Sequence, residues 1–220
     1  MYMKKLFIPF LAGFMTLAAC KDAPKADSAE VAEAQEVEQA SGVTYNVNLT
    51  ESTVEWVGTK PIARHHGTLK LKNGSLVVNN GQLTGGTFTV DINTITPDDQ
   101  DAENNTKLQN HLKSEDFFHV EKYPEGTFEI ASVTEGVQNT ADLVMKDATH
   151  MVTGNLTLKG ITKSITFPAK LSVTDNSVTA HADFNIDRTQ WNIVYGNDES
   201  LGDKFIRPEV NLKVHLVANK

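Results

Sequence analysis

Histidine is the side chain used most often for metal binding and proton transfer near neutral pH, and this chain contains seven histidines. A metal site needs three or four convergent ligands, and no spacing such as HExxH is present. His65 and His66 are adjacent, so on a strand they point to opposite faces and do not easily share one metal ion. We expect solvated surface histidines and no bound metal; a metal-dependent enzyme that uses them is the weaker alternative.

Signatures of nucleophilic catalysis and nucleotide binding are also missing. The sequence contains no GxSxG, P-loop or GxGxxG pattern. With 28 acidic against 20 basic residues, the formal net charge is −8. Nucleic-acid-binding proteins carry a basic footprint instead. These observations predict a protein that is not an enzyme and does not bind nucleic acid.

The only cysteine, Cys20, follows a segment typical of exported proteins. Two lysines precede an apolar run over residues 6–19, which is shorter than the ~20 residues of a membrane-spanning helix. Positions 17–20 read Leu-Ala-Ala-Cys and resemble the lipobox of bacterial lipoproteins. We therefore predict a signal peptide over residues 1–19 and a lipid anchor on Cys20. The alternative is an ordinary signal peptide that leaves Cys20 as a spare thiol.

A lipidated Cys20 would attach the protein to a membrane of the bacterial cell envelope, at the periplasmic face or the cell surface. The following segment, up to residue 42, contains six acids, two lysines and no aromatic residue. Such a composition buries too little apolar surface to offset the entropy of ordering. Residues 20–42 are therefore predicted to be the lipidated cysteine and a disordered acidic tether, and residues 43–220 to be the folded domain.

Nearly all of the predicted domain alternates apolar and polar residues with a period of two. The alternation is clearest over residues 87–94, 152–158, 161–173, 178–187 and 210–216. This period is typical of strands with one buried and one solvated face. Turn sequences such as Asn80-Gly81 and Lys159-Gly160 separate the runs at hairpin spacing.

Many antiparallel strands with one apolar face must close or stack, because open edges invite aggregation. The pattern therefore predicts an all-β antiparallel barrel of about eight strands. A polar stretch near residues 105–114, with two leucines four positions apart, predicts a short helical insertion.

Three stretches of the chain resemble the YceI-like family. They are residues 112–124 (LKSEDFFHVEKYP), residues 154–163 (GNLTLKGITK) and residues 52–60 (STVEWVGTK). The resemblance runs from about Tyr45 to Val217. It implies an extended lipocalin-like β-barrel that binds a long polyisoprenoid, an isoprenoid quinone or a fatty-acid-like lipid, without a cofactor. It also allows a homodimer.

The resemblance turns the inward positions of the strands into candidate ligand contacts. The residues expected to line the lipid are Phe88, Val90, Ile92, Phe128, Ile130, Leu156, Leu158, Ile165, Phe167, Leu171, Phe184, Ile186 and Trp191. Arg64, His66 and Arg188 are the candidates for a polar head group, whereas Trp56 is expected to pack. The predicted function is sequestration or transport of a lipid. The alternative is a surface-displayed structural or interaction module whose barrel is filled by its own side chains.

Overall fold

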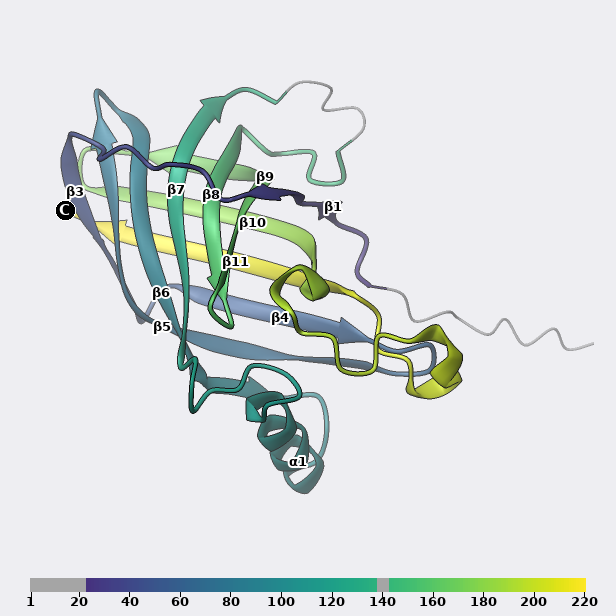
Figure 1. Ribbon diagram of the computed structural model, residues 1–220. Helices are drawn as coiled ribbons and strands as arrows, with labels where there is room; N and C mark the ends of the chain where they lie inside the picture. The colour runs from purple at the N-terminus through teal and green to yellow at the C-terminus, as the bar shows by residue number, and fades with distance from the viewer. Residues whose placement is uncertain (1–22, 138–142) are drawn as a thin grey trace, which may run out of the picture.

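A computed structural model describes residues 23–137 and 143–220 (Figure 1). The predicted signal peptide and Cys20 lie outside the described residues. The barrel is built from β4 (Thr53–Thr59), β5 (Arg64–Asn79), β6 (Gln82–Pro97), β7 (Glu125–Glu135), β8 (His150–Leu158), β9 (Ile161–Val173), β10 (Ser177–Asp187) and β11 (Glu209–Asn219). Each strand pairs antiparallel with the next, and β11 pairs with β4. This closed ring confirms the predicted eight-stranded antiparallel barrel.

A further strand, β3 (Val43–Val47), shares the position of β4 in the ring. β3 pairs with the ends of β11 and β5 that β4 does not reach. Two short segments of 3₁₀ helix, η1 (Arg188–Trp191) and η2 (Glu199–Lys204), lie in the connection between β10 and β11.

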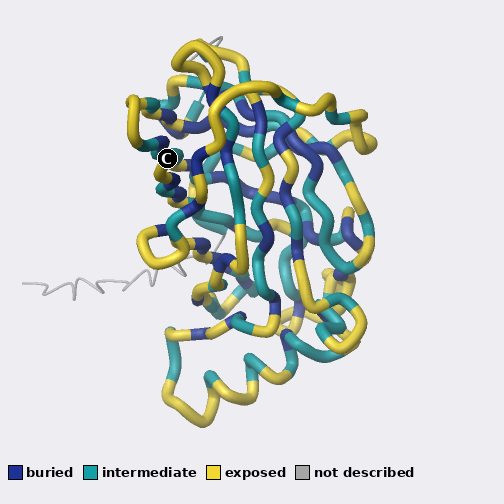
Figure 2. Tube along the Cα trace, turned by 90° about the vertical axis from the view of Figure 1, so that its left-hand side faces the viewer, coloured by how far each residue is buried: buried dark blue, intermediate teal, exposed yellow. Residues whose placement is uncertain are grey.

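The period-two pattern explains which side chains face the interior of the barrel. Along β10 the buried and less buried residues alternate around Ala182 and Phe184, and Figure 2 shows mixed burial along most strands. The aromatic rings of β6 to β10 form a chain across the interior. Phe128 lies between Phe88 and Phe167, with ring centroids 5.4 and 5.7 Å away, and Phe167 stacks on Phe184 at 4.1 Å.

The helical insertion is α1 (Ala102–Lys113), which lies beyond one end of the barrel (Figure 1). It begins three residues before the predicted start, because Asp101 is the N-cap and its side chain accepts a hydrogen bond from the Asn104 N–H at 2.9 Å. This hydrogen bond lowers the pKa of Asp101 below its ordinary value of 3.8. Leu112 is the one buried residue of the helix.

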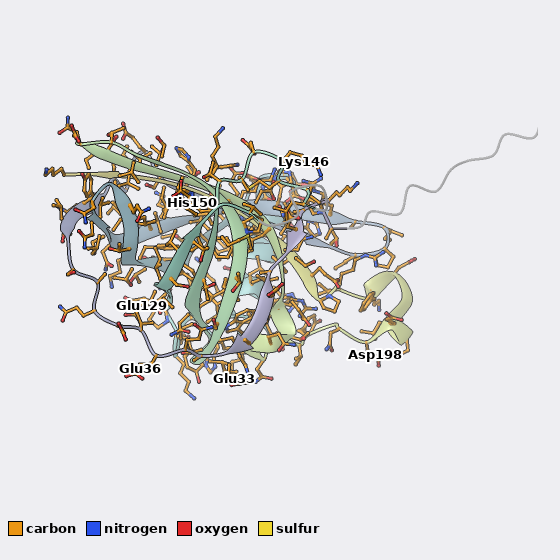
Figure 3. All side chains as sticks on the ribbon, turned by 90° about the horizontal axis from the view of Figure 1, so that it is seen from above. Glu33, Glu36, Glu129, Lys146, His150 and Asp198 are labelled. Carbon is orange, nitrogen blue, oxygen red and sulfur yellow. The ribbon has the colours of Figure 1, made fainter. Side chains whose placement is uncertain are left out.

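The described part of the predicted tether is not disordered. Residues 23–42, here called the N-terminal segment, contain β1 (Asp27–Ser28) and β2 (Glu30–Glu33). β1 pairs parallel with β10, and β2 pairs antiparallel with β9. Ala29 and Val31 pack against the barrel core. In Figure 3 the carboxylates of Glu33 and Glu36 lie on the outer side of the molecule.

Side chains of the barrel wall fix this segment further along its length. Asn185 donates to the carbonyl of Pro24 at 3.1 Å. Asn155 donates to the Gln35 carbonyl at 2.7 Å and accepts from the Gln35 N–H at 2.9 Å. The prediction of disorder counted only the apolar surface of the segment itself. It missed the backbone partners that two incompletely paired strands supply.

Candidate functional site

The barrel encloses a cavity of about 500 Å³, a size typical of small-molecule sites. Side chains from all eight strands of the ring line it, together with residues of α1 and of the β10–β11 connection. Most of these side chains are aliphatic or aromatic. The cavity is partly open, and an apolar molecule that entered it would lose much of its contact with water.

The structure brings nearly all of the predicted lining residues together at this cavity. They are Phe88, Val90, Ile92, Phe128, Ile130, Leu156, Leu158, Ile165, Phe167, Leu171, Phe184 and Ile186. They meet because inward positions of a meandering barrel converge on one axis. Their contact with a ligand stays a prediction.

Trp191 is the exception, since it does not line the cavity. Its side chain is 0% exposed, and its indole N–H donates to the Leu156 carbonyl at 2.9 Å. The alternation of β10 ends at Asp187, where the chain turns into η1. Trp191 therefore packs within the main core cluster without reaching the cavity, instead of continuing the inward row.

Trp56 was expected to pack, and it does, but it also lines the cavity. It belongs to a second apolar cluster with Leu112 of α1 and Phe117, and its side chain is 8% exposed. Its indole Nε1 is buried without a hydrogen-bond partner in the described residues. A second buried polar atom of the lining, the Thr59 hydroxyl, also has no partner there.

Most polar side chains of the lining gather at one end of the barrel, here called the mouth. They are Thr59, Lys60, His65, His111, Arg188, Tyr195 and Lys204. The register explains the grouping, because Gly58 pairs with both His65 and Val210, and Val210 pairs with Ile186. The end of β4, the start of β5, the end of β10 and the start of β11 therefore meet here. α1 adds His111.

Of the three predicted head-group contacts, only Arg188 reaches the cavity. Arg64 is exposed and is not part of the lining. The His66 ring lies outside the lining and contacts Asp98, with 2.6 Å between Nδ1 and Oδ1. Its neighbour His65 lines the cavity instead. The sequence contained a signal for His65, because the row of Leu69 and Leu71, which pack in the barrel core, extends back to His65 by alternation.

The guanidinium of Arg188 is held at the mouth by main-chain carbonyls. It donates to Arg207, Ile193, Tyr195 and Ile206 at 2.5 to 3.2 Å, and the residue is 4% exposed. It forms no ion pair within the described ranges 23–137 and 143–220. Burial lowers its pKa, and the nearby charge of Asp187 opposes that effect. The result is a buried cation surrounded by carbonyl dipoles.

The other mouth residues that the prediction missed are Thr59, Lys60, His111, Tyr195 and Lys204. Lys60 follows β4, and Lys204 ends η2. No periodic pattern covers these connections, so the sequence offered no signal for them. His111 lies on α1, one position before the buried Leu112, and its Nε2 is 3.0 Å from the Asp116 carboxylate.

Within the part of the chain that the structure describes, no group of three or more histidine, cysteine, aspartate or glutamate side chains is placed to hold a metal ion. Among the same residues, no helix combines the length and the apolar character needed to cross a bilayer.

Comparisons with known proteins agree on the family. A family model described as the YceI-like domain matches residues 45–218. Protein YceI of Escherichia coli O6:H1 is 35% identical over 107 residues, which are 48% of each chain. A UPF0312 protein of Pseudomonas putida strain W619 is 35% identical over 104 residues, or 47% of each chain. The chain spans about half the length of the curated relatives it matches.

Solved structures share the fold at lower identity. BcnA of Burkholderia cenocepacia has a TM-score of 0.60 and 22% identity over 78% of this chain and 99% of its own. A polyisoprenoid binding domain from Saccharophagus degradans, implicated in plant cell wall breakdown, has a TM-score of 0.53 and 16% identity. That match covers 80% of this chain and 97% of the other. At these identities the likeness shows the barrel fold alone.

Proposed function

The chain belongs to the YceI-like family, and from this premise and its cavity we propose that it binds a long-chain isoprenoid or a similar amphiphilic lipid inside the barrel. The function is sequestration or transport without a covalent step. The observation that carries the proposal is the partly open cavity of about 500 Å³ inside the barrel, whose wall is mainly aliphatic and aromatic.

The driving force is burial of apolar surface, at roughly 25 cal/mol per Å² removed from water. Phe88, Phe128 and Phe167 supply broad faces for a branched hydrocarbon chain. The relative from Saccharophagus degradans carries the name of a polyisoprenoid binding domain, which supports the same ligand class here.

We place the protein at the bacterial cell envelope, attached through a lipid on Cys20. Cys20 precedes Pro24 by four residues, which span at most about 14 Å. Pro24 is hydrogen-bonded to Asn185 of the barrel wall. An acylated Cys20 would therefore hold the barrel close to the membrane surface, where a lipid ligand is available.

The competing function is a structural or interaction module with a filled barrel. The cavity weighs against it, because a barrel filled by its own side chains would leave no space of this size inside. A homodimer is compatible with either function, and light scattering of the purified protein would decide the oligomeric state.

Organic extraction of the purified full chain followed by mass spectrometry tests the proposal. A long-chain lipid in a stoichiometric amount is the expected result. A clean extract, together with no binding of an added C20 prenol or of a prenylated quinone, would sink the proposal and favour the filled-barrel module.

A further inference from the structure

Exposed apolar side chains gather at one projection of the molecule. In the described part of the chain seven large apolar residues are exposed, and four of the seven lie in only two connections. They are Ile62 of the β4–β5 turn and Val194, Tyr195 and Leu201 of the β10–β11 connection. The two connections lie side by side at the right of Figure 1, and the Arg207 N–H donates to the Thr59 carbonyl at 3.0 Å between them. We call residues 60–64 and 192–206 the tip.

Most of these apolar side chains serve neither the core nor the cavity. Ile62, Val194 and Leu201 belong to neither apolar cluster and do not line the cavity. Ile62 is 62% exposed. Tyr195 is the exception, because it lines the cavity and its ring lies 4.7 Å from that of His111. Apolar side chains that cluster in water without packing inward are typical of a surface that meets a partner or a membrane.

The start of the described chain lies on the same side of the molecule as the tip. The Asn185 side chain, two residues before the end of β10, donates to the Pro24 carbonyl at 3.1 Å. The β10–β11 connection follows directly, and in Figure 1 the N-terminal segment starts on the side to which the tip projects. Cys20 precedes Pro24 by four residues, which span at most about 14 Å. An acyl chain on Cys20 would therefore enter a bilayer on the side of the tip.

Charges on the tip balance one another. Three basic and three acidic residues lie within its two ranges: Lys60, Arg64, Lys204, Asp198, Glu199 and Asp203. This balance gives no selective attraction for a strongly charged protein face or an anionic surface. Burial of apolar side chains is then the driving force, as for other proteins that lie in a membrane interface. Lysine and tyrosine suit that interface, because each joins an apolar body to a polar end.

We propose that the tip docks the barrel on a lipid bilayer, with Ile62 and Leu201 inserted at the level of the head groups. The tip and the acylated Cys20 then hold the barrel at two points and fix its orientation. Three mouth residues, among them Tyr195, belong to the tip, so docking brings the mouth next to the bilayer. A lipid would then pass between bilayer and cavity over a short distance. This inference rests on the proposed function, because it uses the Cys20 anchor.

A fluorescent label on the anchored protein tests the docking. The lipidated full chain is reconstituted in phosphatidylcholine vesicles, and Leu201→Cys or Leu49→Cys carries nitrobenzoxadiazole maleimide. Leu49 is the matched control, since it is 46% exposed against 45% for Leu201 but precedes β4, at the opposite end of that strand from Thr59. The chain has one cysteine, and acylation leaves Cys20 without a free thiol, so only the introduced cysteine reacts.

Quenching by phosphatidylcholine that is spin-labelled on its acyl chain measures how deep each label lies. The Leu201→Cys label should be quenched at least about threefold more than the Leu49→Cys label. A second label at Ile62→Cys tests the apolar driving force. Adding Leu201→Glu should lower its quenching to the level of the Leu49→Cys label, whereas adding Leu49→Glu should leave it unchanged. Both leucines are exposed, so neither substitution should disturb the fold.

The outcomes separate this inference from the proposed function. Equal quenching of the Leu201→Cys and Leu49→Cys labels would overturn the docking and leave the anchor and lipid binding intact. Reaction of the maleimide with the chain that lacks an added cysteine would reveal a free Cys20 thiol, and would overturn the anchor and the docking together. Lipid binding in the cavity is measured separately by organic extraction, so its failure is recognised independently of the quenching.

Discussion

Two parts of the barrel wall are closed in different ways. β8 and β9 pair continuously from His150–Ala169 to Leu158–Ile161 through a tight turn. β9 and β10 also follow each other in the chain, but they pair directly only from Lys170 to Val173 of β9. Beyond that point, β9 pairs with β2 and β10 pairs with β1. We call this second junction the seam.

The difference shows that a local meander does not by itself close this barrel. Along the continuous wall, each strand finds its partner within a few residues of the turn. At the seam, the N-terminal segment supplies the missing backbone partners from more than 120 residues away in the chain, as in the pairing of Val31 with Ile165. Its side chains that pack against the core, Ala29 and Val31, are small to medium in size and only partly buried. We therefore expect the seam to open at a lower free energy than the wall.

The largest expected effect comes from crowding the continuous wall. A Cβ added at Gly154 on β8 would lie 2.4 Å from the Phe128 ring and 2.5 Å from the Glu129 carbonyl. Gly154→Val should therefore lower the free energy of unfolding by about 3 kcal/mol. Urea unfolding measures it. Gly58→Ala is the control, since a Cβ there meets nothing within 4 Å, and a similar loss in both variants would contradict the packing argument.

A smaller effect is expected from loosening the seam. Asn155→Ala removes both hydrogen bonds to the Gln35 backbone and should cost about 1 kcal/mol. Amide hydrogen exchange should rise over residues 27–36 and stay unchanged along β7. Thr157→Ala on the same strand, which loses only a contact with Thr162, should leave exchange at the seam as in the wild type. Faster exchange along β7 instead would show that wall and seam open together.

The ion pair at the edge of the seam should matter less still. Lys163 contacts Glu33 at 2.7 Å, but the Glu33 side chain is 88% exposed. Lys163→Gln should change the free energy of unfolding by less than about 0.5 kcal/mol. A loss above about 1 kcal/mol in the same urea experiment would mean that the contact is shielded from solvent.

The smallest effect concerns pH at the directly paired end of the seam, where Lys170 pairs with His181. A hydrogen bond from Lys170 lowers the pKa of Asp147 below its ordinary value of 3.8. The ionised carboxylate is therefore favoured in the folded state, and its contribution exists above pH 3.8 and is lost as the pH falls through the lower folded value. The Tm of the wild type should exceed that of Asp147→Asn slightly at pH 6, and this difference should vanish near pH 2. A difference that persists there would rule out the carboxylate as its cause.

The candidate site, like the fold, has parts that the sequence predicts and parts that it does not predict. The apolar lining was predictable wherever alternation runs unbroken, as from Phe88 to Ile92 on β6. The prediction that Trp191 lines the cavity was wrong, because the alternation of β10 ends at Asp187 and the sequence does not mark the turn into η1. Lys60 and Lys204 were missed because connections between strands have no period, so only their tertiary position brings them to the cavity. His65 was predictable in principle from the row that contains Leu69 and Leu71.

Local sequence determined the strands, their inward faces and the tight turns, because side chains alternate with a fixed period of two. It also predicted an antiparallel barrel of about eight strands, because open strand edges invite aggregation, but the backbone partners that complete the seam come from the N-terminal segment. Tertiary structure alone decided the order of the N-terminal segment and the composition of the mouth. Both depend on contacts between distant parts of the chain, namely a seam that offers unpaired backbone groups and a register that brings Thr59, His65 and Arg188 to one end of the barrel.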